Sequence, residues 1–227
     1  MIAGELDDGA CRPLPERAAA VVGLPPERLF EEKDTEQYHV CLGATGLRRD
    51  DDRRFAATLL DQILGGGASS RLFQEIRERR GLAYSVYSYG AGYADTGSVG
   101  VYVGTRAENL DDCLEVTVAE ITQLAERRFH PDELERAKDS IKGRLTLSME
   151  STSARMSRLG RNILEDVELL DEDEVCARVD AVTEEQLADL AGELFHPSRL
   201  SAACIGPDRS VFDRALGALD GATTEVV

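Results

Sequence analysis

A pair of strand-like segments joined by a short turn constrains the fold of this chain more than any other feature. Residues 84–93 are rich in Tyr, Val and Ser, and in residues 98–104 valines alternate with Ser, Gly and Tyr. A two-residue period of apolar side chains is typical of a β-strand with one buried face. The segment between them, Ala94–Gly97, has the composition of a hairpin turn. Strands joined by a hairpin run antiparallel, so a purely parallel sheet does not fit this chain.

Most of the remaining chain has helical periodicity. Apolar side chains recur every three or four positions, which places them on one face of an α-helix. The segments with this spacing are residues 55–64, 72–76, 110–125, 131–145, 156–163, 183–194 and 208–219. Two more segments, residues 37–44 and 200–206, have strand character. The predicted order is therefore β, α, α, β, β, α, α, α, α, β, α. It predicts an α+β fold with a mostly antiparallel β-sheet and α-helices packed on one face.

Composition suggests where the domain begins and ends. Residues 1–35 hold four of the seven prolines and few apolar repeats, which predicts a linker with one short helix around residues 16–23. Residues 36–220 carry the strand and helix patterns and are expected to form a single domain. Residues 221–227 are expected to be a tail.

Charge and cysteine usage exclude several classes of function. The formal net charge is −17, so phosphate groups would be repelled and no nucleic-acid partner is expected. No apolar run is long enough to span a bilayer, so no membrane partner is expected either. The five cysteines form no C-x-x-C pair. This favours a reducing compartment over a disulfide framework or a thiolate zinc site, and a cytoplasmic location is the expectation.

One segment carries a resemblance to a known family. Residues 64–87 read LGGGASSRLFQEIRERRGLAYSVY. The glycine triplet, the Ser-Ser-Arg-Leu helix start and the Arg-Gly-Leu-Ala-Tyr exit occur together and in order. This combination resembles the signature of the C-terminal, non-zinc-binding half of pitrilysin/insulinase-family zinc metallopeptidases, in the branch that includes mitochondrial processing peptidase. The similarity runs from about Lys33 to Pro207.

The resemblance implies an enzyme built from two halves that face each other across a closed chamber. In such enzymes the first half carries an H-x-x-E-H helix and a distant glutamate, which bind one zinc ion and polarise its water. The second half lines the opposite wall, where an arginine–tyrosine pair and a glycine-rich loop hold the peptide near the metal. Carried over to this sequence, the catalytic pair corresponds to Arg77 and Tyr84. The substrate-binding loop corresponds to Gly65, Gly66 and Gly67.

Elementary chemistry is consistent with these roles for Arg77 and Tyr84. Gly81 allows the chain to reverse between the helix and the strand, so that both side chains can converge on one point. A guanidinium offers a rigid donor fork to a carbonyl, and a phenol can donate a hydrogen bond to a developing oxyanion. The structural alternative is that the arginine favours the helix dipole and the tyrosine packs with its hydroxyl in water. A helix stop would likewise explain the three glycines.

The chain departs from the zinc-binding half of the family. Its three histidines, His39, His130 and His196, are far apart, and neither H-x-x-E-H nor H-E-x-x-H is present. A catalytic zinc ion takes about three protein ligands and one open position. No metal ligand is therefore assigned to this chain, and zinc is expected only in the parent enzyme. His130 and His196 precede prolines and are interpreted as boundaries of secondary structure, and His39 as a partly buried strand residue.

The leading functional prediction is a substrate-binding, chamber-forming C-terminal domain of a zinc-dependent metalloendopeptidase, inactive by itself. The expected partners are an N-terminal catalytic half, or a zinc-bearing partner subunit, and an extended peptide. The strand at Glu36–Gly43, or its counterpart in the other half, is expected to hold that peptide by strand addition. A homodimer is a further arrangement left open.

Two alternatives to this function stand beside it. The first is a non-catalytic scaffold or assembly subunit related to respiratory-complex core proteins. The second is an unrelated α+β binding domain, which the clustered motif disfavours. The origin of the chain is also open between a natural non-catalytic subunit and a fragment of a larger protein. Residues 1–7 resemble the closing strand of a preceding domain in this family, which favours a fragment.

Overall fold

The fold was analysed in a computed structural model that describes residues 25–222. The short helix expected around residues 16–23 and the closing strand expected at residues 1–7 lie outside the described residues. Most of the tail expected at 221–227 lies outside them too. Within residues 25–222, no helix combines the length and the apolar character needed to cross a bilayer.

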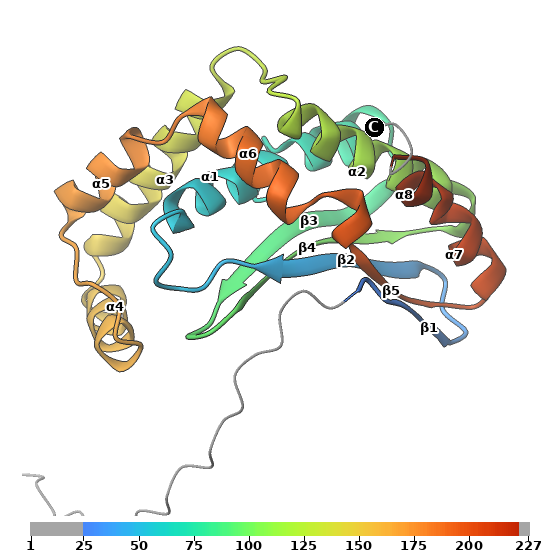
Figure 1. The fold of residues 1–227 in the computed structure, drawn as a ribbon, viewed down its shortest axis with the longest axis horizontal. Helices are drawn as coiled ribbons and strands as arrows, with labels where there is room; N and C mark the ends of the chain where they lie inside the picture. Colours follow the sequence, from blue (N-terminus) through green and yellow to red (C-terminus); the bar gives the residue numbers. More distant parts are fainter. Residues whose placement is uncertain (1–24, 223–227) are drawn as a thin grey trace, which may run out of the picture.

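A five-stranded sheet forms one layer of the molecule, in the spatial order β1-β5-β2-β4-β3 (Figure 1). Its strands are β1 (Arg28–Glu32), β2 (Tyr38–Gly46), β3 (Ala83–Gly92), β4 (Gly97–Thr105) and β5 (Ser201–Gly206). Every neighbouring pair is antiparallel except β1 and β5, which are parallel. The hairpin predicted from the sequence is β3–β4, and the mostly antiparallel sheet is confirmed.

Helices form the second layer and cover one face of the sheet. They are α1 (Arg54–Leu64), α2 (Leu110–Ala125), α3 (Glu133–Met149), α4 (Thr152–Leu164), α5 (Glu172–Asp180), α6 (Glu184–Leu194), α7 (Arg209–Ala215) and α8 (Gly217–Ala222). Shorter helical turns are η2 (Phe73–Arg79), η3 (Ala107–Asn109) and η4 (Pro197–Arg199). Figure 1 shows α1, α2 and α6 above the sheet, while the opposite face carries no helix of the described chain and α4 projects beyond one end. The α+β class with helices on one face is confirmed.

The hydrophobic core lies between the two layers. Along β2, the side chains of Tyr38, Val40 and Leu42 are at most 2% exposed, whereas His39 and Cys41 face the open side. This alternation follows from the two-residue period of a strand. The buried β2 residues belong to the same core as apolar side chains of the helices, and burial of their apolar surface is the main favourable term in folding.

Two elements were not expected from the sequence. Strand β1 falls within the segment assigned to the linker, because its pairing with β5 and the stacking of Phe30 on Phe212 join residues far apart in the chain. Helix α5 was missed because its pattern of apolar residues is sparse. It nevertheless begins with a capping box formed by Asp171 and Glu174, a signal that the sequence did contain.

The expected role of β2 as a peptide-accepting edge is wrong for this chain. β2 pairs with β4 on one side and with β5 on the other, so its backbone groups are already used in the sheet. Among the described residues, β1 and β3 are the edge strands. Pairing across long stretches of chain decides which strand is central, and a strand pattern by itself does not carry that information.

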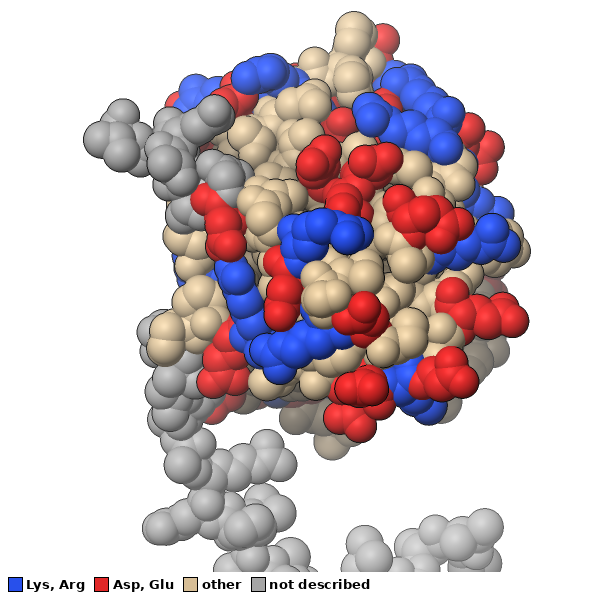
Figure 2. All heavy atoms as spheres, turned by 90° about the vertical axis from the view of Figure 1, so that its right-hand side faces the viewer, with Lys and Arg blue, Asp and Glu red and all other residues tan. Residues whose placement is uncertain are grey.

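Charged side chains of both signs are interspersed on the end of the molecule formed by α7, α8 and β1 (Figure 2). Ion pairs link the elements there: Arg214 lies 2.7 Å from Asp111, and Arg28 pairs with Asp220. The face in Figure 2 therefore shows no continuous basic patch of the kind that nucleic-acid binding uses.

Candidate functional site

Arg77 and Tyr84 lie together, as the motif predicted. Arg77 is near the end of η2 and Tyr84 is at the start of β3. The guanidinium carbon of Arg77 lies 4.4 Å from the centroid of the Tyr84 ring. The Arg77 side chain is 34% exposed and Tyr84 is 76% exposed, so both reach solvent. The structure thus brings the two side chains to one exposed point, although it does not test their role.

The turn between η2 and β3 is fixed by a glycine and by backbone hydrogen bonds. Gly81 has a φ of +61°, and a Cβ added there would meet no other atom within 4 Å. It is therefore the backbone angle, rather than crowding, that requires glycine here. The amide of Leu82 donates to the carbonyl of Ile76 at 2.8 Å. The Leu82 carbonyl in turn accepts hydrogen bonds from Thr105 Oγ1 at 2.5 Å and Asn109 Nδ2 at 3.0 Å.

Tyr84 occupies a β-bulge. Ala83 pairs with Thr105 and Ser85 pairs with Gly104. Tyr84 is therefore an extra residue of β3 that has no paired residue on β4. A bulge bends a strand and redirects a side chain, and bulges are common next to active sites. The helix that carries Arg77 is irregular as well, because η2 is of the π type, which is frequent at functional sites. The two residues of the pair therefore sit on two adjoining irregular elements.

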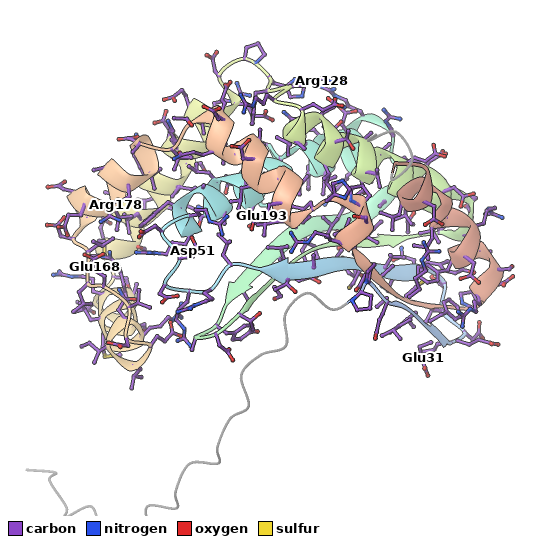
Figure 3. The ribbon with its side chains drawn as sticks, in the orientation of Figure 1. Glu31, Asp51, Arg128, Glu168, Arg178 and Glu193 are labelled. Atoms are coloured by element: carbon purple, nitrogen blue, oxygen red, sulfur yellow. The ribbon has the colours of Figure 1, made fainter. Side chains whose placement is uncertain are left out.

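Arg71, from the same motif, has a different environment. Its side chain is 2% exposed, and it donates to Glu133 at 2.9 and 2.6 Å and to the carbonyl of Arg128 at 2.7 Å. Glu120 lies 3.5 Å away, and burial raises the pKa of the Glu120 carboxyl above its usual value. These contacts tie the segment that leads into η2 to α2, to the start of α3 and to the loop between them. Figure 3 shows Arg128 on that loop, at the helical side of the molecule.

The sequence did not single out Arg71, Glu120 or Glu133. Arg71 is one of several arginines in a charged stretch, and burial is what distinguishes it. An arginine directly after two serines at a predicted helix start is a weak signal. The partners Glu120 and Glu133 lie about 50 or more residues further along the chain, so only the packing of α2 and α3 reveals them.

The first glycine of the triplet lies beside Ser88 of β3 rather than beside Tyr84. A Cβ added to Gly65 would come within 2.2 Å of the Ser88 backbone nitrogen, and one added to Gly66 within 2.9 Å of the Asp61 carbonyl oxygen. Ser88 is four residues beyond Tyr84, which corresponds to roughly 13 Å along a strand. At Gly67 the nearest atom would be 3.6 Å away, on the side chain of Gln62. Close packing of α1 against β3 therefore accounts for Gly65, and crowding by the last turn of α1 itself accounts for Gly66. A substrate-binding role for the triplet stays a prediction.

The family is decided by comparison with known proteins. The family model for the peptidase M16 inactive domain matches residues 11–141, more than half of the chain. The chain belongs to this family. The assignment to the half of these peptidases that does not bind zinc is thereby confirmed, while the processing-peptidase branch stays a prediction. The matched residues begin inside the segment that the sequence assigned to a linker.

This M16 inactive domain spans about half the length of the curated relatives that it matches. A protein of Streptomyces coelicolor named as an uncharacterized zinc protease is 42% identical over 90% of this chain and 44% of its own length. A protein of Bacillus subtilis with the same description is 42% identical over 74% of this chain and 41% of its own length. The solved peptidase M16 inactive domain from Pseudomonas fluorescens has a TM-score of 0.72 at 26% identity, covering 86% of this chain and 47% of that chain.

The three histidines of the M16 domain take part in local structure. His39 is partly buried, as expected, and its Nδ1 lies 2.7 Å from Tyr102 Oη. His196 accepts a hydrogen bond from the Ser198 amide and caps η4, and the His130 amide donates to Glu133 just before α3. Over residues 25–222 no group of three or more His, Cys, Asp or Glu side chains is placed to hold a metal ion.

The open face of the sheet carries aromatic side chains. Tyr102 on β4 stacks on Tyr87 of β3 with ring centroids 4.9 Å apart, and burial raises the pKa of the Tyr102 phenol. A groove of about 500 Å³ lies beside Tyr102, bordered by Leu29 and Ile205. This face is therefore apolar and uncovered in the described residues, and Tyr84 lies at one end of the same strand as Tyr87.

Proposed function

We propose that this M16 inactive domain is the peptide-holding wall of a zinc-dependent metalloendopeptidase of the processing-peptidase-like branch. The observation that carries the proposal is the contact between Arg77 and Tyr84, at 4.4 Å from the guanidinium carbon to the ring centroid. Tyr84 is exposed and Arg77 is partly exposed, at an irregular junction between a helix and a strand. Their polar groups can therefore reach a bound peptide, and the apolar face of the sheet next to them would line the chamber.

The two residues would act on the peptide through hydrogen bonds. The guanidinium of Arg77 donates to a carbonyl of the substrate and keeps the scissile region in position. The phenol of Tyr84 donates to the oxygen on which negative charge develops during attack. Zinc would supply a polarised water molecule from the other half. The described residues do not fit a zinc site, so no step on the metal is assigned to this chain.

The proposed partner is the half of the peptidase that carries zinc, either in the same parent chain or in a separate subunit. The chain spans 44% of the Streptomyces relative, so that protein has room for a second half of similar size. An extended peptide is the proposed substrate, and the counterpart of β2 in the catalytic half is the strand we expect to grip it. A homodimer is not needed for this arrangement.

Cleavage of a peptide by the two halves together tests the proposal. The zinc-bearing half is added to the purified chain, and kcat/KM is measured for the wild type and for Tyr84→Phe. Loss of a hydrogen-bond donor to an oxyanion typically lowers the rate by about 10²–10³-fold, and that fall is expected here. Tyr93→Phe is the matched control, because Tyr93 is also exposed but lies past the far end of β3.

The same experiment separates catalysis from a scaffold role. Unchanged cleavage in both Tyr84→Phe and Arg77→Ala would contradict the proposal. If the variants still bind the zinc-bearing half and cleavage is normal, assembly of the complex becomes the better explanation for this chain.

We propose a reducing compartment, such as the cytoplasm, as its location. The cysteines at positions 41, 113, 176 and 204 are free. Burial raises the pKa of Cys113 to about 11 and that of Cys204 to about 12, which keeps both thiols protonated and unreactive. Cell fractionation followed by immunodetection tests this location, and recovery with secreted proteins would contradict it.

A further inference from the structure

Two arginines six residues apart in the motif use their side chains in opposite ways. Arg71 is buried and its guanidinium donates to Glu133 and to the Arg128 carbonyl. Arg77 is 34% exposed, and its nearest carboxylate is that of Glu78, 3.7 Å from Nε. Among residues 25–222 the Arg77 guanidinium donates no hydrogen bond that would occupy it. Its N–H groups are thus available to a bound peptide. Some other contact must then hold the side chain in place.

Two aromatic rings contact Arg77. Its guanidinium carbon lies 4.7 Å above the centroid of Phe73 and 4.4 Å above that of Tyr84. A guanidinium over the face of a ring is attracted by the ring quadrupole. That attraction acts on the charge as a whole and needs no N–H group to be given to an acceptor. Aromatic contact can therefore orient an arginine while its donors stay available.

Phe73 is the better anchored of the two rings. Tyr84 is 76% exposed and occupies a bulge, whereas Phe73 is partly buried and is the first residue of η2. Its preceding neighbour, Leu72, is fully buried, and Arg71 before it is held by its ion pairs. Phe73 and Arg77 are four residues apart, a spacing at which side chains on a helix are neighbours. Because the start of η2 is held in place, the Phe73 ring is held too, and its contact with Arg77 restricts the position of the guanidinium.

We propose that Phe73 is a positioning residue that holds Arg77 in the orientation needed to receive a peptide carbonyl. Without the ring, the long arginine side chain would sample many rotamers and would lose that freedom only on binding. Phe73 itself does not touch the reacting atoms. The effect on peptide binding rests on the function proposed above for Arg77, whereas the effect on the orientation of Arg77 does not.

The first test measures the orientation of Arg77 in the chain alone. Protons above an aromatic ring resonate upfield, so NMR of ¹⁵N-labelled arginine should show an upfield Arg77 Nε–Hε signal. In Phe73→Leu that signal is expected to move toward the value of a free arginine, and in Phe73→Tyr to keep most of its shift. Phe55→Leu is the matched control, because Arg54 lies 4.6 Å above the Phe55 ring on α1, away from this site.

The second test measures cleavage of a peptide by the full two-half enzyme. Phe73→Leu is expected to raise KM roughly two- to five-fold, the range expected for an exposed cation–π contact, with a smaller change in kcat. Phe73→Tyr, which keeps an aromatic ring at this position, should have a KM close to that of the wild type. In a double-mutant cycle, Phe73→Leu should add nothing to Arg77→Ala, because both changes remove the same oriented donor.

The outcomes distinguish this inference from the function on which it depends. An Arg77 signal unchanged in Phe73→Leu, with the fold intact by thermal unfolding, overturns the positioning role. A signal that moves as expected while Arg77→Ala cleaves normally supports positioning and contradicts the proposed function. Equal effects of Phe73→Leu on KM in the presence and absence of Arg77 would assign the ring to direct contact with substrate and overturn the inference.

Discussion

A buried arginine anchors the segment that carries the site. Arg71 is 2% exposed and meets two carboxylates, of Glu133 at 2.6 Å and Glu120 at 3.5 Å. Charges in such a position have lost their hydration and depend on one another. The adjoining helix carries Arg77, whose proposed role requires the opposite: a charge that can reach solvent.

Replacing Arg71 by methionine should destabilise the protein strongly. Breaking a buried ion pair by removing one partner leaves an uncompensated charge and costs about 3–5 kcal/mol. Urea unfolding followed by circular dichroism measures the loss. Arg79→Met is the control: the Arg79 side chain, which pairs with Glu75 on the same helix, is 65% exposed, and a loss of about 1 kcal/mol or less is expected. Equal losses in both variants would contradict the anchoring role.

The buried carboxyl of Glu120 predicts a particular pH dependence. Burial raises its pKa in the folded state above its usual value, so the folded protein binds this proton more tightly than the unfolded chain does. Its contribution to stability is therefore present below the unfolded pKa and is lost as pH rises through the folded pKa. Glu120→Gln should gain stability relative to the wild type as pH rises from about 4 to 7.

Urea unfolding across that pH range measures the difference. Glu115→Gln is the matched control, because Glu115 is exposed on the same helix, α2, and should show no such trend. A wild-type protein that becomes more stable relative to Glu120→Gln over this interval would reverse the expected sign.

At the scale of elements, the junction of η2 with β3 creates the candidate site. The positive φ of Gly81, the π-type turns of η2 and the bulge at Tyr84 together redirect two side chains that a regular helix and strand would separate. Gly65, elsewhere in the motif, allows α1 and β3 to approach closely. Gly65 ends α1 where that helix approaches β3, and no side chain fits between them.

Substitutions in the glycine triplet should separate packing from substrate binding. Gly65→Ala places a Cβ within 2.2 Å of Ser88 backbone and should destabilise the fold, typically by 1–3 kcal/mol for such overpacking. Gly67→Ala meets its nearest atom at 3.6 Å and should leave stability within about 0.5 kcal/mol. Thermal unfolding measures both. Wild-type stability in Gly67→Ala with a loss of peptide cleavage would support a substrate-touching loop at that position alone.

At the scale of the whole molecule, the described residues form two layers with one uncovered sheet face (Figure 1). Helices cover one face of the sheet, and the other face exposes aromatic and apolar side chains (Figure 1). Helix α4 also presents Met156, Leu159 and Ile163 to solvent, each more than half exposed. Predicted as a helix from these same residues, α4 forms as expected, but its apolar stripe stays more than half exposed in the described part of the chain.

The purified 227-residue chain should bind no stoichiometric zinc and cleave no peptide by itself. The reason is that ligands for a catalytic zinc ion must converge in threes, and no such group occurs in the described part of the chain. Elemental analysis after dialysis measures the metal, and a fluorogenic peptide measures cleavage. The zinc-bearing half, assayed under the same conditions, is the positive control. One zinc ion per chain together with proteolysis would contradict the division of labour proposed here.

The sequence alone determined the fold class, most of the helices and the identity of the motif. These follow from local periodicity: alternation in β3 and β4, helical spacing in α2 and α6, and glycine at a turn that needs a positive φ. They depend on neighbours in the chain, which a sequence shows directly. The pairing of Arg77 with Tyr84 was expected from the family resemblance, and the six residues between them, Gly81 included, are consistent with a turn that brings the two side chains together.

Only the tertiary structure decided which strands are central, which charges are buried and which glycines are crowded. β1 joins the sheet through β5, about 170 residues away in the chain. Arg71 is buried and Arg79 is exposed, because helices that come later in the chain cover only Arg71. Gly65 is crowded and Gly67 is not, because β3 approaches only Gly65. Burial, pairing and close contact are properties of segments that meet in space. The energies that select them arise between residues far apart in the chain, and no local pattern encodes them.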